Sequence, residues 1–351
     1  MTIFAAVEEQ WRMPAEWERQ SMIQLTWPHR GTDWRPMIEE ITAVYVTMAA
    51  AISRRERLLV VCPDSGDVRK MLSRCLTAAE MDNITFYSCP TDDTWARDHG
   101  LISLVGTADG EHCCEPLLLD FRFNGWGGKF PSDRDNAVSS SVYGAGLVRG
   151  KYEDNLDFVL EGGSIESDGQ GTVFTTTRCH TAAGRNGQPK AQIEQELLRR
   201  LRARRIVWID HGGLAGDDTD GHIDTLVRVA PDYTLLYTRA REGDEHYAEL
   251  MLMESELRAL RTLDGQPYRL VPLPLPSAIC DDNGCRLPAT YANFLVINGA
   301  VLVPVYGQPA TDRQALQLIG RAFPDRETVA VDARPIIRQY GSVHCCAMQY
   351  Y

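Results

Sequence analysis

The chain lacks the features that define several large protein classes. No glycine-rich phosphate loop of the GxGxxG or GxxxxGKS/T type follows a predicted strand, so a nucleotide-binding doubly wound sheet is not expected. No window approaches the run of about 18 apolar residues that a membrane-spanning helix needs, so we expect no membrane partner. The N-terminal stretch MTIFAAVEEQWRMP is acidic and has no long apolar core, which argues against a signal peptide and predicts a cytoplasmic protein.

Basic residues are also fewer than acidic residues. The 36 Lys and Arg residues are outnumbered by 48 Asp and Glu residues, which gives a formal net charge of −12 at pH 7. A nucleic-acid partner is therefore not expected, because a phosphate backbone needs a basic face. A carboxylate-lined cleft would instead attract a cationic small molecule, although a solvated acidic surface explains the same composition.

Cysteine pairs with metal-binding spacing are missing as well. The ten cysteines include no CxxC pair, and the nearest approach to one, Cys280 and Cys285, has four residues between its members. A structural zinc site is therefore not expected. Reduced thiols fit better than a disulfide framework, because the cysteines are diluted over 351 residues.

The sequence does contain a regular alternation of short apolar strands and helices. Helices are predicted at 35–53, 66–80, 191–203, 244–262 and 311–321. Strands are predicted at 21–27, 57–62, 83–89, 101–105, 157–167, 171–177, 204–210, 222–230, 233–238, 268–275, 293–307, 327–333 and 342–349. No linker rich in Ser, Gly and Pro divides the chain, so we predict one α/β domain over residues 1–351 with about five strand–helix units.

Two segments at predicted strand ends combine carboxylates with features that favour ligand binding. TDDTWARDHG (91–100) contains Trp95 near Asp98, and an aromatic wall beside a carboxylate suits a flat cation. LEGGSIESDG (160–169) contains Glu161 before two glycines, which let the backbone approach another group closely. Taken alone, each segment also fits an ordinary surface turn.

A third segment, AGDDTDGHIDTLVRV (215–229), combines four aspartates with a histidine. His222 and Asp224 would share one face of a strand there. A calcium-binding EF-hand loop starting at Asp218 is excluded, because its sixth and twelfth positions hold isoleucine and valine instead of glycine and glutamate.

A fourth segment, GSVHCCAMQ (341–349), supplies two neighbouring thiols. In a strand, neighbours point to opposite faces, so Cys345 and Cys346 cannot both enter one site, and His344 falls on the face of Cys346. Either cysteine could equally be a small buried hydrophobic residue. A thiol nucleophile needs a histidine elsewhere in the chain, and His222 is a candidate.

Together these segments predict a site with one thiol, one histidine and three carboxylates. Carboxylates would oppose the oxyanion of a protease, whereas they suit a planar guanidinium, which they hold by paired charge-assisted hydrogen bonds. A papain-like hydrolase is disfavoured, because it would place an early cysteine before a late histidine, the reverse of the order here.

In their order, the segments resemble the agmatine deiminases and the related bacterial (Porphyromonas-type) peptidylarginine deiminases of the guanidine-modifying superfamily. The resemblance covers nearly the full chain and implies the pentein fold, a five-bladed α/β propeller with pseudo-fivefold symmetry. It rests on TWPHRGTDW (26–34), DDTWARDHG (92–100), FNGWGGKFPSDRDN (123–136), LEGGSIESDGQGT (160–172), GDDTDGHIDTLVR (216–228), YANFLVINGAVLVPVYG (291–307) and YGSVHCCAMQ (340–349).

The resemblance also implies a catalytic role for five residues, namely Cys345, His222, Glu161, Asp98 and Asp224. Cys345, which directly follows the histidine, matches the nucleophile, and Cys346 becomes a packing residue. His222 matches the general acid and base, and Glu161 matches the carboxylate that orients that histidine. These roles imply a covalent amidino-thioether intermediate that water hydrolyses, with no metal or organic cofactor.

Two of these catalytic residues and two further residues are implied to bind the substrate. Asp98 and Asp224 match the pair that holds the guanidinium, with Trp95 as a neighbouring wall. Asp218 lies where agmatine deiminases place an acid near the amine end of the substrate. The segment 123–136 is predicted to form a loop over the active site.

The implied reaction is hydrolysis of agmatine to N-carbamoylputrescine and ammonia, a step in polyamine synthesis. Peptidylarginine deimination is the near alternative. Free arginine is disfavoured, because the matched motifs identify no arginine that would bind its carboxylate. A catalytically silent polyamine-binding protein on the same fold is a further alternative. The chain has QYGSVHC where many agmatine deiminases have GGGNIHC, which leaves the specificity for the distal end of the substrate open. A homo-oligomer is also possible on the sequence alone.

Overall fold

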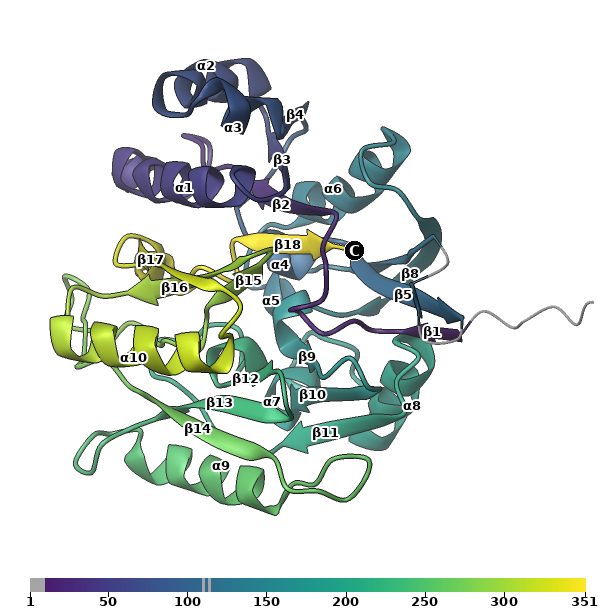
Figure 1. The fold of residues 1–351 in the computed structure, drawn as a ribbon, viewed down its shortest axis with the longest axis vertical. Coiled ribbons are helices and arrows are strands. Elements are labelled where there is room, and N and C mark those ends of the chain that lie inside the picture. The colour runs from purple at the N-terminus through teal and green to yellow at the C-terminus, as the bar shows by residue number, and fades with distance from the viewer. Residues whose placement is uncertain (1–9, 109–110, 113–114) are drawn as a thin grey trace, which may run out of the picture.

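The computed structural model describes residues 10–108, 111–112 and 115–351 and has a mixed α/β architecture (Figure 1). Within these residues the strands form five separate sheets. In turn, the sheets contain β1 (Gln10–Arg12), β5 (Ile102–Ala108), β6 (Glu111–His112), β7 (Leu117–Arg122) and β8 (Lys151–Val159); β9 (Ile165–Ser167), β10 (Thr172–Thr176) and β11 (Arg205–Ile209); β12 (Val227–Ala230), β13 (Thr234–Arg239) and β14 (Arg269–Pro274); β15 (Leu295–Ile297), β16 (Ala300–Val305) and β17 (Glu327–Asp332); and β18 (Ala347–Tyr350), β2 (Met22–Thr26), β3 (Arg57–Cys62) and β4 (Ile84–Ser88).

The same strand–helix unit recurs in each of these sheets. An antiparallel pair of strands is followed by a helix and then by a strand that runs parallel to the second, as a helical crossover allows. One unit joins the two ends of the chain, because β18 pairs with β2. The crossover helices are α1 (Ile38–Ser53), α6 (Asp133–Gly144), α8 (Lys190–Arg200), α9 (Tyr247–Ala259) and α10 (Pro309–Ala322).

Helix α10 shows how the local sequence builds such a crossover. Pro309 occupies its first turn, where a missing backbone N–H costs nothing. Ala315, Ile319 and Ala322 are buried at spacings of four and three residues, so they form one apolar stripe that packs inward. The sequence therefore specifies both the start and the buried face of this helix.

Two short helices, α4 (Ala96–His99) and α5 (Gly125–Gly128), lie near the middle of the fold (Figure 1). In Figure 1 the long helices α1, α9 and α10 lie at the periphery, whereas α4 and α5 lie near the middle, beside β18 and β9. Short irregular segments, and not the long helices, are therefore available to build a central site. The remaining elements are α2 (Ser65–Cys75), α3 (Ala78–Asp82) and α7 (Thr177–Thr181), with the 3-10 helices η1 (Arg35–Met37), η2 (Gly162–Ser164), η3 (Ile223–Thr225) and η4 (Ile336–Gln339).

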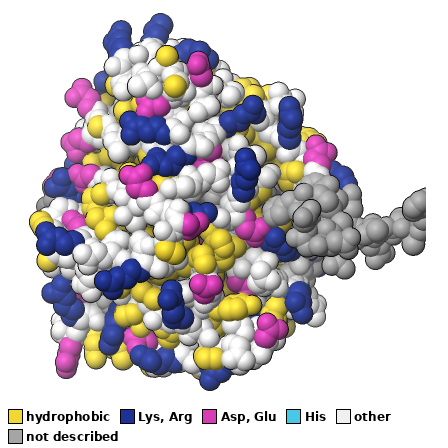
Figure 2. Space-filling model, viewed as in Figure 1, with side chains coloured by type: hydrophobic (Ala, Val, Ile, Leu, Met, Phe, Trp, Pro, Cys, Tyr) yellow, Lys and Arg dark blue, Asp and Glu magenta, His cyan; other side chains and the backbone are white. Residues whose placement is uncertain are grey.

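The surface carries charges of both signs. On the face shown in Figure 2, Lys and Arg side chains are interspersed with Asp and Glu side chains and do not gather into one basic patch. None of the helices formed by the described residues is both long enough and apolar enough to cross a membrane.

Most predicted helices and strands are present with shifted ends, but several regions differ. The helix predicted at 66–80 is two helices, because Thr77 starts the second one in a capping box with Glu80. The strand predicted at 293–307 is the antiparallel pair β15–β16, with Gly299 at a φ of 74° in the turn. The strand predicted at 157–167 is split, because residues 162–164 form a 3-10 helix between β8 and β9. Helix α6 and strand β7 have no counterpart among the predicted elements.

Two predicted strands that carry site residues begin later than expected. Residues 223–225 form η3, and residues 343–346 form a turn, so that β12 and β18 start only at Val227 and Ala347. The predicted alternation of faces at 222–224 and at 343–346 is therefore wrong, since it holds only within a strand.

Candidate active site

The five residues predicted to be catalytic lie on short segments that follow or precede strands. Asp98 lies on α4, Glu161 directly before η2, His222 directly before η3, Asp224 on η3, and Cys345 in the turn before β18. Each of the five is at most 5% exposed, so their charges interact with little screening by solvent.

Gly163, in η2, is the point on which three of these side chains converge. A Cβ atom at this position would lie 2.6 Å from His222 Nδ1, 2.9 Å from Asp98 Oδ1 and 3.1 Å from Asp224 Oδ2. Only glycine leaves room for three groups so close to the backbone, which explains the second glycine of the LEGG segment.

His222 lies between two carboxylates. Its Nε2 is 3.1 Å from Glu161 Oε2, and its Nδ1 is 3.7 Å from Asp98 Oδ1. Burial by itself lowers the pKa of His222, but the Asp98 carboxylate and the hydrogen bond to Glu161 raise that pKa well above its usual value. The histidine is therefore an imidazolium at neutral pH.

Glu161 is held in its ionised form by two cations. The Arg185 guanidinium donates to both of its oxygens at 3.1 and 3.2 Å, and His222 donates at 3.1 Å. Burial alone would raise the pKa of Glu161, but hydrogen bonds and charge from His222 and Arg185 lower it to about 2. This carboxylate therefore stays negative throughout the physiological pH range.

The carboxylates of Asp98 and Asp224 differ in how many partners they have. Asp98 accepts hydrogen bonds from the Gly163 backbone N–H and from Trp126 Nε1, both at 2.9 Å. Asp224 Oδ2 lies 2.8 Å from His344 Nδ1, whereas its Oδ1 is buried and has no partner among the described residues. Burial raises the pKa of Asp98, and it raises the pKa of Asp224 to about 7.

Two buried polar atoms of the site are thus left without hydrogen bonds, namely Asp224 Oδ1 and His222 Nδ1. Buried polar groups are paired in most proteins, because an unpaired one costs about 1–3 kcal/mol. A ligand that carries several N–H donors would satisfy the carboxylate, which is what a guanidinium offers.

The Cys345 thiol lies at the same carboxylate. Its Sγ is 3.4 Å from Asn293 Oδ1 and 3.7 Å from Asp224 Oδ2. Burial raises the pKa of this thiol well above its usual value, and the negative charges of Asp224 and Asp98 raise it further. Cys345 is therefore a protonated thiol before substrate arrives.

Cys346 is separated from the site by the turn and not by strand alternation. Its Sγ donates to the Ser342 carbonyl at 3.3 Å, and it is fully buried in a hydrophobic cluster. The predicted separation of His344 from Cys345 is wrong, since both side chains contact the same Asp224 oxygen.

A second group of residues forms a cavity of about 200 Å³, here called the mouth cavity. The predicted wall residue Trp95 packs against Gly341, where a Cβ atom would lie 2.1 Å from its ring. Asp218 also lines the cavity, and burial together with Asp217 raises its pKa to about 7. The complete lining is Asp33, Asp93, Trp95, Trp126, Phe130, Asp218, Arg338, Gln339 and Tyr340.

The segment 123–136 contributes to both the site and the mouth cavity. Trp126 bonds Asp98, and Phe130 packs edge-on against Trp126 with ring centroids 5.5 Å apart. Lys129 anchors the segment, because its Nζ lies 2.6 Å from the Asp218 carbonyl oxygen. The segment is partly helical, and two of its side chains line the mouth cavity.

One cluster in the described chain has the donor types of a metal site. Glu161, Cys179 and His222 each place one ligand atom within 4.8 Å of the others. Arg185 already donates to both Glu161 oxygens and brings a positive charge, so the cluster fits a cation poorly. Cys179 Sγ instead donates to Glu161 Oε2 at 3.6 Å.

Four residues that contact the predicted site were not singled out for it from the sequence. Arg185 and Cys179 hold Glu161, Trp126 holds Asp98, and Asn293 accepts hydrogen bonds from the His344 and Cys345 backbone N–H groups. Trp126 and Asn293 lie within the segments that resemble the family, so the sequence could have marked them as candidates for the site. Arg185 and Cys179 lie outside them, and nothing in the sequence marks their contact with Glu161.

An α/β scaffold that gathers a thiol, a histidine and three carboxylates is what we predicted for a guanidine-modifying protein. The chain belongs to the Porphyromonas-type peptidyl-arginine deiminase family, whose model matches residues 12–350. This confirms the resemblance drawn from the sequence motifs.

Individual relatives extend over nearly the whole chain. The agmatine deiminase of Pseudomonas aeruginosa (strain LESB58) is 32% identical over 365 residues, which cover 96% of this chain and 95% of the relative. A crystal structure of a Porphyromonas gingivalis protein, provisionally named an arginine deiminase, is 47% identical with a TM-score of 0.89, covering 97% of this chain and 98% of that one. A substrate-bound cysteine-to-serine variant of C. jejuni agmatine deiminase is 34% identical with a TM-score of 0.88, covering 100% and 99%.

Proposed function

We propose that this protein is a hydrolase that deiminates agmatine, yielding N-carbamoylputrescine and ammonia through a covalent intermediate on Cys345. The observation that carries the proposal is the unpaired, buried Asp224 Oδ1 beside the Cys345 thiol and the His222 imidazolium. The agmatine deiminases of Pseudomonas aeruginosa and C. jejuni, similar along their full lengths, support agmatine as the substrate.

Binding places the guanidinium between two carboxylates. Asp98 and Asp224 both lie close to Gly163 and neutralise the cation by charge-assisted hydrogen bonds. The bound cation opposes the field that keeps the Cys345 thiol protonated, so it favours the thiolate. The substrate therefore helps to activate its own nucleophile.

Catalysis then needs two proton transfers by His222. After Cys345 Sγ bonds to the guanidinium carbon, the imidazolium gives its proton to the departing ammonia. The neutral ring next takes a proton from water, whose oxygen attacks the same carbon and displaces the sulfur. Glu161 holds the imidazole in place through both steps, since it stays ionised.

The mouth cavity is suited to bind the distal end of the substrate. Its lining includes the three carboxylates of Asp33, Asp93 and Asp218, which suit the primary amine of agmatine. We assign the distal amine to this acidic cavity, with Trp95 as one wall.

Arginine is a second candidate substrate, because the mouth cavity also contains Arg338. This side chain is 43% exposed and lies 3.7 Å from Glu40, so it is accessible to a substrate carboxylate. It supplies the carboxylate-binding arginine that the sequence motifs did not identify. The Porphyromonas gingivalis protein provisionally named an arginine deiminase supports the same candidate.

Three wider features belong to the proposal. The five recurring units, with β18 closing onto β2, support a five-bladed propeller formed by residues 1–351 as one catalytic domain. A cytoplasmic location agrees with the free state of the eight cysteines that the structure describes. The protein needs no metal or organic cofactor, because thiol, acid and base all come from the chain.

The direct test is ammonia release from agmatine, arginine and a blocked arginyl peptide. The proposal expects ureido product with agmatine at the highest kcat/KM. Turnover of the arginyl peptide alone would replace agmatine by a peptide substrate. Tight agmatine binding without turnover of any of the three would identify a silent polyamine-binding protein and end the enzyme proposal.

A further inference from the structure

A chain of buried polar groups leads away from the nucleophile to a second cavity. Cys345 Sγ is 3.7 Å from Asp224 Oδ2, which lies 2.8 Å from His344 Nδ1. The other ring nitrogen of His344, Nε2, lies 3.4 Å from Glu16 Oε2. His344 is 2% exposed, and the catalytic steps above do not use it.

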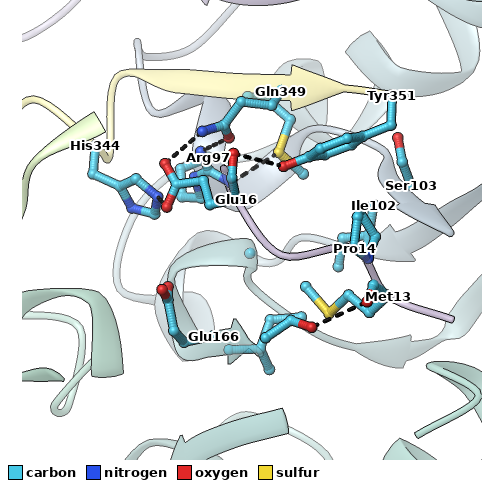
Figure 3. Close-up of a pocket in the computed structure, with 14 residues that line it drawn as sticks. Met13, Pro14, Glu16, Arg97, Ile102, Ser103, Glu166, His344, Gln349 and Tyr351 are labelled. Atoms are coloured by element: carbon cyan, nitrogen blue, oxygen red, sulfur yellow. Dashed lines mark hydrogen bonds and ion pairs between the residues drawn. The ribbon is translucent and has the colours of Figure 1, made fainter. Parts of the chain in front are cut away.

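The second cavity, here called the inner cavity, has a volume of about 50 Å³ (Figure 3). His344 and Glu16 line it together with Gln349, whose Nε2 donates to Glu16 Oε1 at 2.5 Å. Figure 3 shows these three side chains directed toward one another beside β18. A water needs only about 10–15 Å³ and two to four polar partners, so this cavity has room for water.

The lining of the inner cavity also offers a way out. Met13 and Tyr351 are its two half-buried lining residues, whereas its other lining residues are buried. Glu16, next to His344, bonds Arg228 in a buried ion pair. A proton that reaches Glu16 or water in this cavity is therefore close to the protein surface.

The first chemical step creates a need for such a path. The Cys345 thiol is protonated, and its proton must leave before Sγ can bond to carbon. His222 cannot take this proton, because it already holds the one that ammonia needs. Of the two side chains that accept a hydrogen bond from Sγ in the described chain, the Asn293 amide oxygen is no base, which leaves the Asp224 carboxylate.

We propose that His344 relays the thiol proton of Cys345 from Asp224 to Glu16 and the water of the inner cavity. His344 is thus a positioning residue that acts through Asp224, and the inference rests on the proposed function. Burial lowers the pKa of His344, and the charges of Arg228 and Arg97 lower it further, so the ring starts out neutral, as a relay requires.

In the resting site, Asp224, whose pKa burial raises to about 7, holds a proton at Oδ2 that it shares with His344 Nδ1, since two acceptors would not lie 2.8 Å apart. When the guanidinium binds, this proton moves to Nδ1 and the ring releases its Nε2 proton toward Glu16, so the ring ends as the other neutral tautomer. The freed Asp224 carboxylate takes the proton of the breaking Sγ–H bond, and the sulfur lone pair forms the bond to the guanidinium carbon. When the thiolate is later expelled, the path runs in reverse, and the proton on the product oxygen is released to solvent, where it converts the ammonia to ammonium.

The charged groups around His344 come from several elements of the fold. They are Asp224 on η3, Glu16 after β1, Arg228 on β12, Arg97 on α4 and His222 before η3. Two carboxylates thus face the ring nitrogens, and the cations around them disfavour an imidazolium.

The variant His344→Gln tests the relay. A glutamine amide can still donate a hydrogen bond to Asp224, but it cannot pass a proton from one side to the other. We expect kcat for agmatine to fall about 10²-fold, with KM changed less than about threefold. The matched control is His99→Gln, a buried histidine that bonds Thr26 Oγ1 at 3.2 Å and takes no part in the path.

A second readout needs no turnover. Chloroacetamidine, a cationic amidine, alkylates Cys345 only after the thiol loses its proton, so His344→Gln should slow this alkylation by about the factor found for kcat. Wild-type turnover tests the proposed function, whereas the ratio of variant to wild-type alkylation tests the relay. An inactive wild type with an unchanged alkylation ratio would therefore refute both.

The relay is overturned if His344→Gln keeps wild-type kcat and alkylation rates. It is also overturned if kcat and alkylation persist while KM rises, because that result assigns His344 only to orienting Asp224. Should His344→Gln fail to fold, Glu16→Gln interrupts the same path at its far end and is judged by the same two measurements.

Discussion

The mouth cavity and the inner cavity both adjoin the candidate active site, but they share no lining residue. The mouth cavity, of about 200 Å³, includes the exposed rings of Phe130 and Tyr340 among its walls. The inner cavity, of about 50 Å³, is lined by buried polar side chains, Glu16 and His344 among them, together with apolar ones. The difference teaches that one cavity has the size and access to receive a substrate, whereas the other is suited to water and protons.

The largest expected effect comes from replacing the nucleophile, Cys345. Cys345→Ser should lower kcat for agmatine at least about 10³-fold, because serine is a far weaker nucleophile here. Cys346→Ser is the matched control and should retain most activity, since its thiol donates to the Ser342 carbonyl and is buried in a hydrophobic cluster. Product formation followed by mass spectrometry measures both, and the reverse ranking would assign the chemistry to Cys346.

The convergence point of the site gives the next largest effect. Gly163→Ala would place a methyl group 2.6 Å from His222 Nδ1 and 2.9 Å from Asp98 Oδ1, so one of these groups must move. We expect kcat/KM to fall about 10²-fold, since displacements of about 1 Å cost that much. Gly144→Ala, where an added Cβ meets nothing within 4 Å, is the control. Equal activity of the two variants would contradict the convergence.

A pH profile sharpens the comparison without any mutation. Burial raises the pKa of Asp224 to about 7, so below that pH the carboxyl is neutral and holds a guanidinium weakly. We expect kcat/KM for agmatine to rise with pH by up to about tenfold per unit until about pH 7 and then to level off. A profile that is flat from about pH 5 to 8 would show that Asp224 titrates elsewhere.

Arg338, at the mouth cavity, should produce the smallest effect, confined to one substrate. Arg338→Ala should lower kcat/KM for arginine about tenfold, the size of one exposed charge-assisted contact, and leave agmatine unchanged. Steady-state kinetics with both substrates provide the internal control. A parallel loss with both substrates would mean that Arg338 supports the cavity and does not bind a carboxylate.

The secondary structure around the site shows where sequence reasoning stops. The periodicity of 311–321 predicts helix α10 to within two residues at its start, because its buried stripe is a local pattern. The same reasoning extends a strand through 343–346, where the structure has a turn. Asn293 accepts hydrogen bonds from two backbone N–H groups of that turn, and no local pattern predicts a partner some fifty positions away.

The polar partners of the site show the same limit. Family-like motifs singled out Glu161 and Asp98 by residue type, yet Arg185 and Trp126, which hold them, were not singled out for that role. A strand would turn His344 away from Cys345, so the sequence pattern predicts no role for it in the site. In the turn it bonds Asp224 instead.

The sequence by itself determined the inventory of this protein: its α/β alternation, its acidic charge, its family, and the thiol, histidine and carboxylates of the site. Those features are encoded by residue type and short spacing. Only the tertiary structure decided which groups touch, which oxygen stays unpaired, and that His344 connects the nucleophile to a second cavity. The reason is physical: the bonds of His222 to Glu161 and of His344 to Asp224 join residues 61 and 120 positions apart, and only folding brings such groups together.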